Sequence, residues 1–164
     1  MESNRKAYDE ALMEWRWAEN LYQTLLGRIE AGDEPQQLRL EAGISQTATL
    51  GLWEHWRSEE NDPKFYVVMG VGIEQDVHTP LVAYASLYGP RAGNMTFRNL
   101  IHEDRGFLVP IDRPSVPYVG PRFVIRRVLG GLARTILQVQ APIIAMCKTR
   151  TATMKRIEGF LLNI

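Results

Sequence analysis

Two neighbouring strand patterns near the middle of the chain constrain the fold more than any other feature. Residues 64–73 are rich in β-branched and aromatic side chains, and residues 74–80 after them have the composition of a turn. In the returning segment 81–88, apolar side chains occupy both alternating sets of positions, so both faces of that strand are expected to be at least partly covered. These segments predict two strands joined by a turn, around which the rest of the chain is arranged.

Further short strands are expected on either side of this pair. Residues 50–56 supply a first strand, and residues 95–100 and 106–110 have strand composition after a second turn at 89–94. Four or five short strands at this spacing predict a small β barrel or a curled antiparallel sheet. The expected fold class is α+β, with helices flanking the barrel or sheet at both ends of the chain.

The order of residues in this module also carries a family pattern. The positions that carry it lie between residues 53 and 100 and are Trp53, His55, Trp56, Tyr66, Val68, Gly70, Val71, Gly72, Asp76, Val82, Tyr84, Leu87, Tyr88, Gly89 and Arg98. Over this stretch the chain resembles the small uncharacterised family catalogued as domain of unknown function 1653. It departs from the family's pattern at Arg57, Ser58 and Asn99. The resemblance implies an SH3-like barrel and no established activity.

Length and composition fit one domain with extensions. The chain has 164 residues, 45% of them hydrophobic, which is enough for a buried core. We expect a helical segment at 1–49, a β-barrel module at 50–112 and a basic extension at 113–164 packed on the same domain. The amino terminus lacks the apolar run of a signal peptide, and the single Cys147 cannot form an internal disulfide. A cytoplasmic protein without a membrane segment is therefore expected.

A net charge of zero conceals a strong asymmetry along the chain. Residues 1–112 hold ten Lys or Arg against eighteen Asp or Glu, whereas residues 113–164 hold nine against one, Glu158. One interpretation is that the basic segment folds back on the acidic one, so that the two neutralise each other. The other is that the arginines of the basic segment face an anionic ligand or, less favoured, a nucleic acid.

The amino-terminal segment shows a clean helical period. Apolar residues recur at alternating steps of three and four, as in a heptad seam. The seam consists of Tyr8, Ala11, Trp15, Ala18, Tyr22, Leu25 and Ile29. Such a stripe indicates either a helix packed on its own domain or a helix that pairs with a second copy of the chain. Gly32 and Pro35 end this helix, and residues 36–43 allow a short second one.

The basic extension allows two interpretations. Residues 122–129 and 132–139 flank Gly130 and Gly131, a pair that suits a two-residue hairpin turn. The competing interpretation is a helix, which the glycine pair destabilises by about 2 kcal/mol relative to alanines. The hairpin is slightly favoured for residues 122–139. After Pro142, helical spacing predicts a carboxy-terminal helix.

No motif in the sequence dictates one chemistry. The three histidines, His55, His78 and His102, lack a recognised metal-ligand spacing, so no metal or other cofactor is expected. Nucleophile elbows, phosphate-binding loops and dinucleotide fingerprints are absent. Cys147 lies in an apolar run and is expected to be an inert thiol.

Aromatic and basic residues give the strongest functional hypothesis. Base stacking on aromatic rings and bidentate binding of phosphate by arginine favour a non-enzymatic module that binds an anionic, nucleotide-like ligand. The candidate ligand-binding residues are Trp53, His55, Trp56, Arg98, Arg122 and Arg126. Two alternatives stay open: an assembly protein that oligomerises through the heptad helix, and a small hydrolase that uses His55 with an acidic partner.

Overall fold

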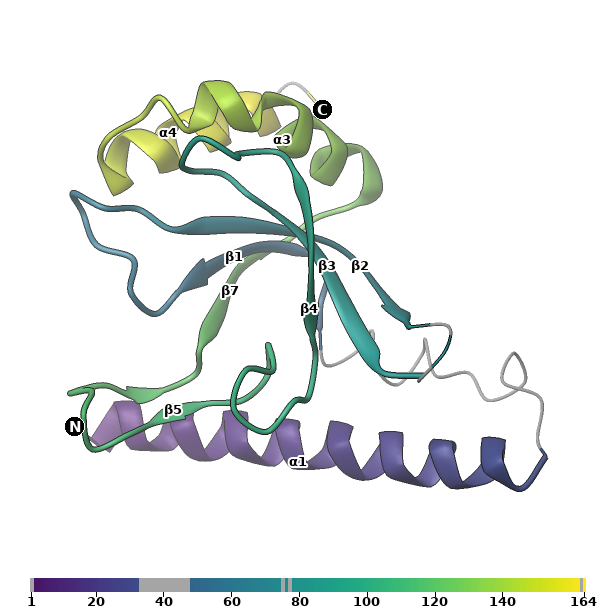
Figure 1. Cartoon of the computed structure of the whole chain (residues 1–164). Coiled ribbons are helices and arrows are strands. Elements are labelled where there is room, and N and C mark those ends of the chain that lie inside the picture. The colour runs from purple at the N-terminus through teal and green to yellow at the C-terminus, as the bar shows by residue number, and fades with distance from the viewer. Residues whose placement is uncertain (1, 33–47, 75, 77, 163) are drawn as a thin grey trace. The chain divides into compact units, whose positions relative to one another are not determined.

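The computed structural model of the chain describes residues 2–32, 48–74, 76, 78–162 and 164. The helices are α1 (Glu2–Glu30), α3 (Gly131–Ile144) and α4 (Arg150–Leu161), and the strands are β1 (Gly51–His55), β2 (Phe65–Ile73), β3 (Pro80–Ser86), β4 (Met95–Asn99), β5 (Ile111–Asp112), β6 (Val119–Gly120) and β7 (Phe123–Val128) (Figure 1). The short helix expected at 36–43 lies outside the described residues. Among those described, no helix is long and apolar enough to cross a membrane.

The chain divides into two units that alternate along the sequence. Unit 1 contains Met1–Ala48, Val71–Val82 and Arg98–Arg122, and unit 2 contains Thr49–Gly70, Ala83–Phe97 and Phe123–Ile164. The three consecutive segments expected from the sequence cut the chain at other places and stay a prediction.

Five strands form an antiparallel sheet in the order β4-β3-β2-β1-β7, and β5 and β6 form a separate pair. The α+β class and the expected strands at 50–56, 64–73, 81–88 and 95–100 are confirmed, with ends shifted by a few residues. The sheet of the described residues has two open edges, β4 and β7, and does not close. The antiparallel sheet is therefore confirmed, whereas the SH3-like barrel is not.

The core of unit 2 lies between the sheet and helices α3 and α4. Figure 1 shows both helices over one face of β1 and β2. Alternate residues of the strands point to this face, because side chains change sides at each strand position. The core residues are Leu52, Phe65, Val67, Ala85, Leu87, Leu129, Ala133, Leu137, Ala141, Ile144 and Ile157.

One glycine is required where β1 meets β7. Gly51 has a φ of 154°, and a Cβ atom added there would lie 2.1 Å from the carbonyl oxygen of Arg127. The register of the two strands shifts between Leu52 and Trp53. Only glycine lets the backbones approach this closely at that position.

The slightly favoured hairpin at 122–139 is wrong in its second half. The first arm is strand β7, but residues from Gly131 onward form α3. Gly130 is the N-cap residue with extended backbone angles (φ −70°, ψ 172°), so it lies outside the helix and does not weaken its interior. Burial of Ala133, Leu137, Ala141 and Ile144 at helical spacing against the sheet favours the helix.

The strand expected at 106–110 is also wrong. These residues form a buried loop whose amides donate to earlier carbonyls: Phe107 N to Asn99 O at 2.8 Å and Leu108 N to Leu100 O at 3.0 Å. The apolar run reflects burial, since Phe107 and Leu108 are 2% and 8% exposed. A short apolar run does not by itself distinguish a strand from a buried loop.

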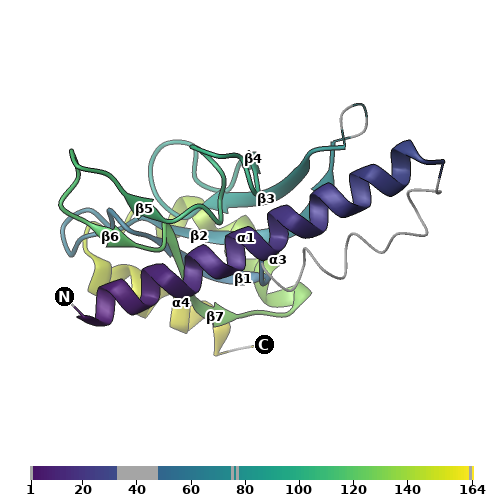
Figure 2. The same cartoon turned by 90° about the horizontal axis from the view of Figure 1, so that it is seen from below.

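In unit 1, helix α1 lies alongside the β5–β6 pair (Figure 2). The predicted helix over Tyr8–Ile29 is confirmed and begins earlier, at Glu2. Two residues of the heptad seam, Ala18 and Leu25, are 1% and 5% exposed. The indole Nε1 of Trp15 donates a hydrogen bond of 3.2 Å to the carbonyl of Ile101. These contacts use part of the seam for packing within unit 1.

Candidate functional site

Aromatic rings gather around Tyr66 in unit 2. Its ring centroid lies 5.3 Å from that of Tyr84, 5.5 Å from that of Tyr88 and 5.5 Å from that of Phe123, each in an edge-on arrangement. The His55 ring meets Phe123 edge-on at 5.0 Å. Because Phe65 and Val67 point into the core under α3 and α4, Tyr66 between them points to the opposite face of the sheet.

Two cations lie over rings at this place. The guanidinium carbon of Arg57 is 4.8 Å from the Trp56 ring centroid, and the Lys64 ammonium is 5.2 Å from that of Tyr88. Trp56 and Tyr88 are partly exposed, and Arg57 is exposed. Such cation–π pairs contribute about 0.5–1 kcal/mol at exposed sites. We call Trp56, Arg57, Lys64, Tyr66 and Tyr88 the aromatic–basic cluster.

Hydrogen bonds orient the polar groups in and next to the cluster. The Tyr66 and Tyr88 hydroxyls bond to each other. His55 Nδ1 accepts from the Arg57 amide at 3.2 Å, so a neutral His55 carries its proton on Nε2. The Lys64 ammonium also pairs with Asp62 at 2.8 Å. The Lys64 ammonium is therefore held by Asp62 and keeps further donor capacity, because an ammonium has three N–H groups.

Three candidate ligand-binding residues with rings, Trp53, His55 and Trp56, lie in or directly after β1. Trp56 belongs to the aromatic–basic cluster, and His55 lies beside it. His55 and Trp56 are partly exposed, with their ring centroids 5.8 Å apart. Trp53 is 7% exposed and its Nε1 donates to the Thr49 carbonyl at 2.7 Å. Trp53 is therefore positioned as a core residue.

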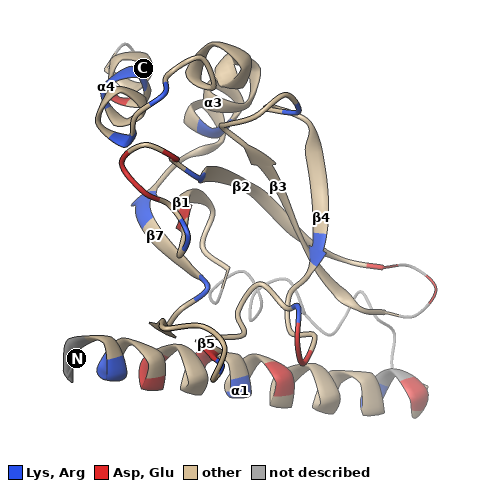
Figure 3. Cartoon of the chain, turned by 60° about the vertical axis from the view of Figure 1, so that its left-hand side comes forward, with Lys and Arg blue, Asp and Glu red and all other residues tan. Residues whose placement is uncertain are grey.

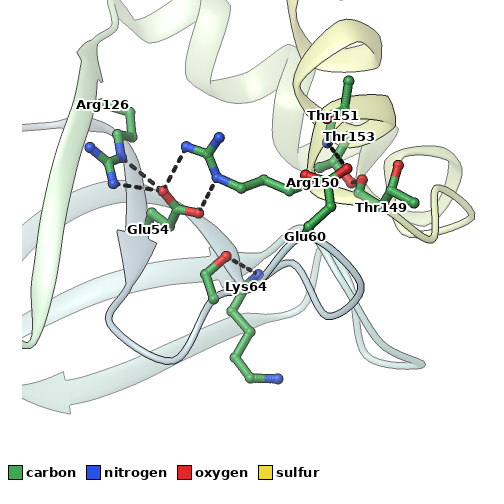
Figure 4. A network of polar contacts seen from close by, with 9 residues as sticks. Glu54, Glu60, Lys64, Arg126, Thr149, Arg150, Thr151 and Thr153 are labelled. Carbon is green, nitrogen blue, oxygen red and sulfur yellow. Dashed lines mark hydrogen bonds and ion pairs between the residues drawn. The ribbon is translucent and has the colours of Figure 1, made fainter. Parts of the chain in front are cut away.

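Arg126 takes part in an ion network around the buried carboxylate of Glu54 (Figure 4). Its Nε donates to Glu54 Oε1 at 2.8 Å, and Arg150 donates to both oxygens of the same carboxylate, Nε to Oε2 at 2.8 Å and Nη2 to Oε1 at 3.0 Å. The Glu54 side chain is 5% exposed. Burial alone raises the pKa of Glu54, but hydrogen bonds from Arg150, Ser58 and Arg126 and the charge of Arg150 hold the pKa below its ordinary value.

This network ties the basic segment to the acidic one. Glu54 lies in β1, whereas Arg126 and Arg150 come from β7 and the first residue of α4. The hydrogen bond to Glu54 raises the pKa of the Arg150 guanidinium. At this place, arginines of the basic segment 113–164 neutralise a carboxylate of the acidic segment 1–112, which supports the first interpretation of the charge asymmetry.

The other two proposed arginines belong to unit 1 and bond to backbone carbonyls. Arg122 is 8% exposed; its Nε donates to Val109 O at 3.3 Å and its Nη2 to Asp104 O at 3.1 Å. Arg98 Nε donates to Arg105 O at 2.7 Å. Both guanidinium groups thus help to hold the loop that follows β4.

Sequence reasoning missed Arg57 and Lys64. In the sequence, Arg57 is a departure from the family pattern and Lys64 is the first residue of a predicted strand, and neither is a candidate ligand-binding residue. A signal was present for Arg57, since it directly follows His55 and Trp56. None linked Lys64 to Tyr88, because the two are brought together only by the pairing of β2 with β3.

Unit 1 contains a separate pocket of about 250 Å³. It lies between α1 and the segments around β3 and β4, and is lined by Glu19, Tyr22, Gln23, Thr79, Pro80, Asn99, Ile101 and His102. His102 Nδ1 accepts from the Asp104 amide at 3.3 Å. In the described residues, no group of three or more His, Cys, Asp or Glu could hold a metal ion.

No protein-family model, curated protein or solved structure matches this chain. The resemblance to domain of unknown function 1653 stays a prediction.

Proposed function

We propose that the protein is a non-enzymatic binding module for an anionic ligand with a planar aromatic part, such as a nucleotide, and that the aromatic–basic cluster of unit 2 is its site. The observation that carries the proposal is the position of Arg57 over Trp56 and of Lys64 over Tyr88. Partly exposed rings next to cations match a ligand that combines a base with a phosphate.

The two parts of such a ligand have separate partners in the cluster. Stacking of a base on an aromatic ring contributes about 1–3 kcal/mol, and Trp56 offers the larger of the partly exposed rings. A guanidinium binds phosphate oxygens through two parallel N–H groups, which is a role for Arg57. Lys64 adds a compact second charge.

Neither alternative has comparable support. For the hydrolase, the carboxylate next to His55 in sequence is Glu54, which points to the opposite face of β1 and is held by Arg126 and Arg150. For assembly through α1, the seam residues Ala18 and Leu25 are buried. Arg122 and Arg126, the first candidates for phosphate binding, are already bonded to Val109 O and Glu54.

Three probes separate the contributions of ring and charge. Adenosine monophosphate carries both, adenosine carries only the base and ribose 5-phosphate only the anion. We expect the monophosphate to bind most tightly by calorimetry and to raise the melting temperature in proportion to its occupancy. Its affinity should fall as salt rises, because exposed charges are screened.

Matched variants locate the site. Arg57→Gln and Lys64→Gln should each weaken binding of the monophosphate about tenfold, since a charge-assisted hydrogen bond contributes about 1.5–3 kcal/mol. Arg91→Gln removes another exposed cation of unit 2 and should leave binding unchanged. The proposal fails if no nucleoside monophosphate shifts the melting temperature, or if Arg91→Gln weakens binding as much as Arg57→Gln does.

A further inference from the structure

Helix α3 has apolar residues on two of its faces. One face, with Ala133, Leu137, Ala141 and Ile144, is buried in the core of unit 2. The other carries Leu132, Val139, Ile143 and Met146, which are 64%, 67%, 42% and 72% exposed. Nine of the eleven large hydrophobic residues found exposed in the described chain belong to unit 2. Exposed aliphatic side chains that lie together mark an interaction surface more often than single ones do.

These four exposed residues and the partly exposed Ile136 follow the spacing of a helix-docking seam. Leu132, Ile136, Val139, Ile143 and Met146 are separated by alternating steps of four and three, as at the contact positions of a coiled coil. We call these five residues the outer seam. From Leu132 to Ile143 it extends about 17 Å along the helix, which matches about three turns of a partner helix. Met146 continues it into the turn after α3, where its amide donates to Ile143 O at 3.1 Å.

Two side-chain hydrogen bonds fix the rotation of α3 about its own axis. Arg134 Nη1 donates to Leu129 O at 2.6 Å, and Gln138 Nε2 donates to Gly93 O at 3.2 Å. Together with the buried face, these bonds fix which side of the helix faces outward. A surface that is ordered in advance loses little conformational entropy when it binds.

The outer seam ends next to a basic pocket. Cys147, which directly follows Met146, lines a pocket of about 590 Å³ together with Ala152, Lys155, Arg156, Gly159 and Phe160 of α4. A Cβ atom added to Gly159 would meet no atom within 4 Å. A glycine inside a helix lowers the stability of the helix by about 1 kcal/mol relative to alanine. No close contact within the described chain requires a glycine at position 159. Gly159 is one of the residues that line the pocket.

Three exposed cations, Lys148, Lys155 and Arg156, lie in or next to the segments that line this pocket. The residues of unit 2 include ten Lys or Arg and five Asp or Glu. Figure 3 shows Lys and Arg on β7 and α4. Arg126, Arg127 and Arg150 form ion pairs with Glu54 or Glu158. Lys148, Lys155 and Arg156 are exposed, and none of them has an ion pair with another described residue.

We propose that the outer seam and the basic pocket together bind one amphipathic helix of a partner protein, with apolar residues facing the seam and acidic residues on its flanks and at the end that meets Lys155 and Arg156. Opposite charge selects this occupant. A second copy docking seam to seam would bring two positively charged surfaces together, which opposes association. This surface is independent of the aromatic–basic cluster.

Two synthetic peptides test the proposal. Each carries three heptads with leucine and isoleucine at the seam positions, one with Glu and one with Lys at the flanking positions. Like charges on the flanks keep each peptide from pairing with itself. We expect the Glu peptide to bind the full chain at least tenfold more tightly than the Lys peptide at low salt, by fluorescence anisotropy. The difference should shrink as salt rises.

Variants assign the binding to the seam and the pocket. Val139→Gln combined with Ile143→Gln should weaken the Glu peptide at least tenfold, and Lys155→Gln combined with Arg156→Gln should remove most of the preference for Glu over Lys. Met13→Gln changes an exposed apolar residue of unit 1 and should change nothing. Circular dichroism checks that each variant remains folded, which is expected because all four seam and pocket positions are exposed.

Three outcomes overturn the proposal. The first is equal binding of the two peptides, and the second is unaltered binding to the folded Val139→Gln and Ile143→Gln double variant. The third is a wild-type dimer by light scattering that this double variant converts to a monomer, which would assign the seam to a second copy of the chain.

Discussion

Glu54 and Arg150 form a two-bond pair between residues 96 positions apart, Nε to Oε2 at 2.8 Å and Nη2 to Oε1 at 3.0 Å. The pair joins the fourth residue of β1 to the first residue of α4, next to the N-cap Thr149. A carboxylate that is 5% exposed thus has two arginine partners, of which Arg150 and Arg126 are 38% and 41% exposed. The partly exposed guanidinium groups retain water when the carboxylate is removed.

Replacing Glu54 should therefore destabilise unit 2 without unfolding it. We expect Glu54→Gln to lower the free energy of unfolding by about 2 kcal/mol, less than the 3–5 kcal/mol typical of a fully buried pair, because the arginines are solvated. Urea denaturation measures the change. Glu158→Gln is the matched control: it removes the exposed partner of Arg127 and should cost less than about 1 kcal/mol. Equal costs for the two variants would contradict the structural role of Glu54.

Because the pKa of Glu54 is lowered in the folded protein, the stability that Glu54 contributes should decrease at acidic pH. Its pKa in the folded protein lies below the ordinary value of 4.5. The ionised group therefore contributes stability that is fully present above pH 4.5 and is lost as the pH falls through the folded pKa. Urea midpoints of the wild type and Glu54→Gln, measured from pH 7 to pH 3, should converge at the acidic end. A gap that stays constant over this range would show that ionisation of Glu54 does not matter.

Gly51 should tolerate no side chain. In Gly51→Ala, the new Cβ would lie 2.1 Å from the Arg127 carbonyl oxygen, so β1 and β7 would have to separate. We expect a loss of about 3 kcal/mol or more in the free energy of unfolding, which is large for one methyl group. Gly70→Ala, in β2, provides the comparison, because an added Cβ there meets nothing within 4 Å. Similar stability of the two variants would argue against the β1–β7 register.

Substitutions in helix α1 can distinguish packing of the helix within unit 1 from pairing of the helix with a second copy of the chain. Replacing Trp15 and Tyr22 by Glu removes the hydrogen bond to Ile101 and places two charges on the face that packs within unit 1. We expect a loss of about 3 kcal/mol, with fast amide exchange in residues 98–122 by mass spectrometry. Glu at the exposed positions Met13 and Trp17 should leave exchange unchanged. A folded monomer from an oligomeric wild type would instead support the assembly hypothesis.

Local patterns in the sequence were sufficient for α1 and for β1 to β4. The steps of three and four from Tyr8 predict the helix, and the β-branched and aromatic composition of 64–73 predicts β2. The prediction of a hairpin at 122–139 is wrong because Gly130 and Gly131 precede and begin a helix instead of forming the centre of a turn. The helical spacing from Ala133 to Ile144 becomes decisive only once the sheet is there to bury it. Tertiary packing thus outweighed local turn chemistry.

The candidate site was less predictable than the fold. His55 and Trp56 follow from the aromatic content of the β module, but the partners of the arginines do not. Arg126 meets a carboxylate 72 positions earlier, and Arg122 meets carbonyls 13 and 18 positions earlier. Charge counts along the chain show an excess of arginine but cannot show which guanidinium groups are already bonded.

The alternation of the two units along the chain has a practical consequence for dissecting the protein. The chain passes between the units five times, and three of these passages lie within β2, β3 and β4. No single cut releases either unit by itself, so a truncation at 112 that follows the sequence segments would split both. Only variants that keep all six segments, such as point substitutions, leave both units whole.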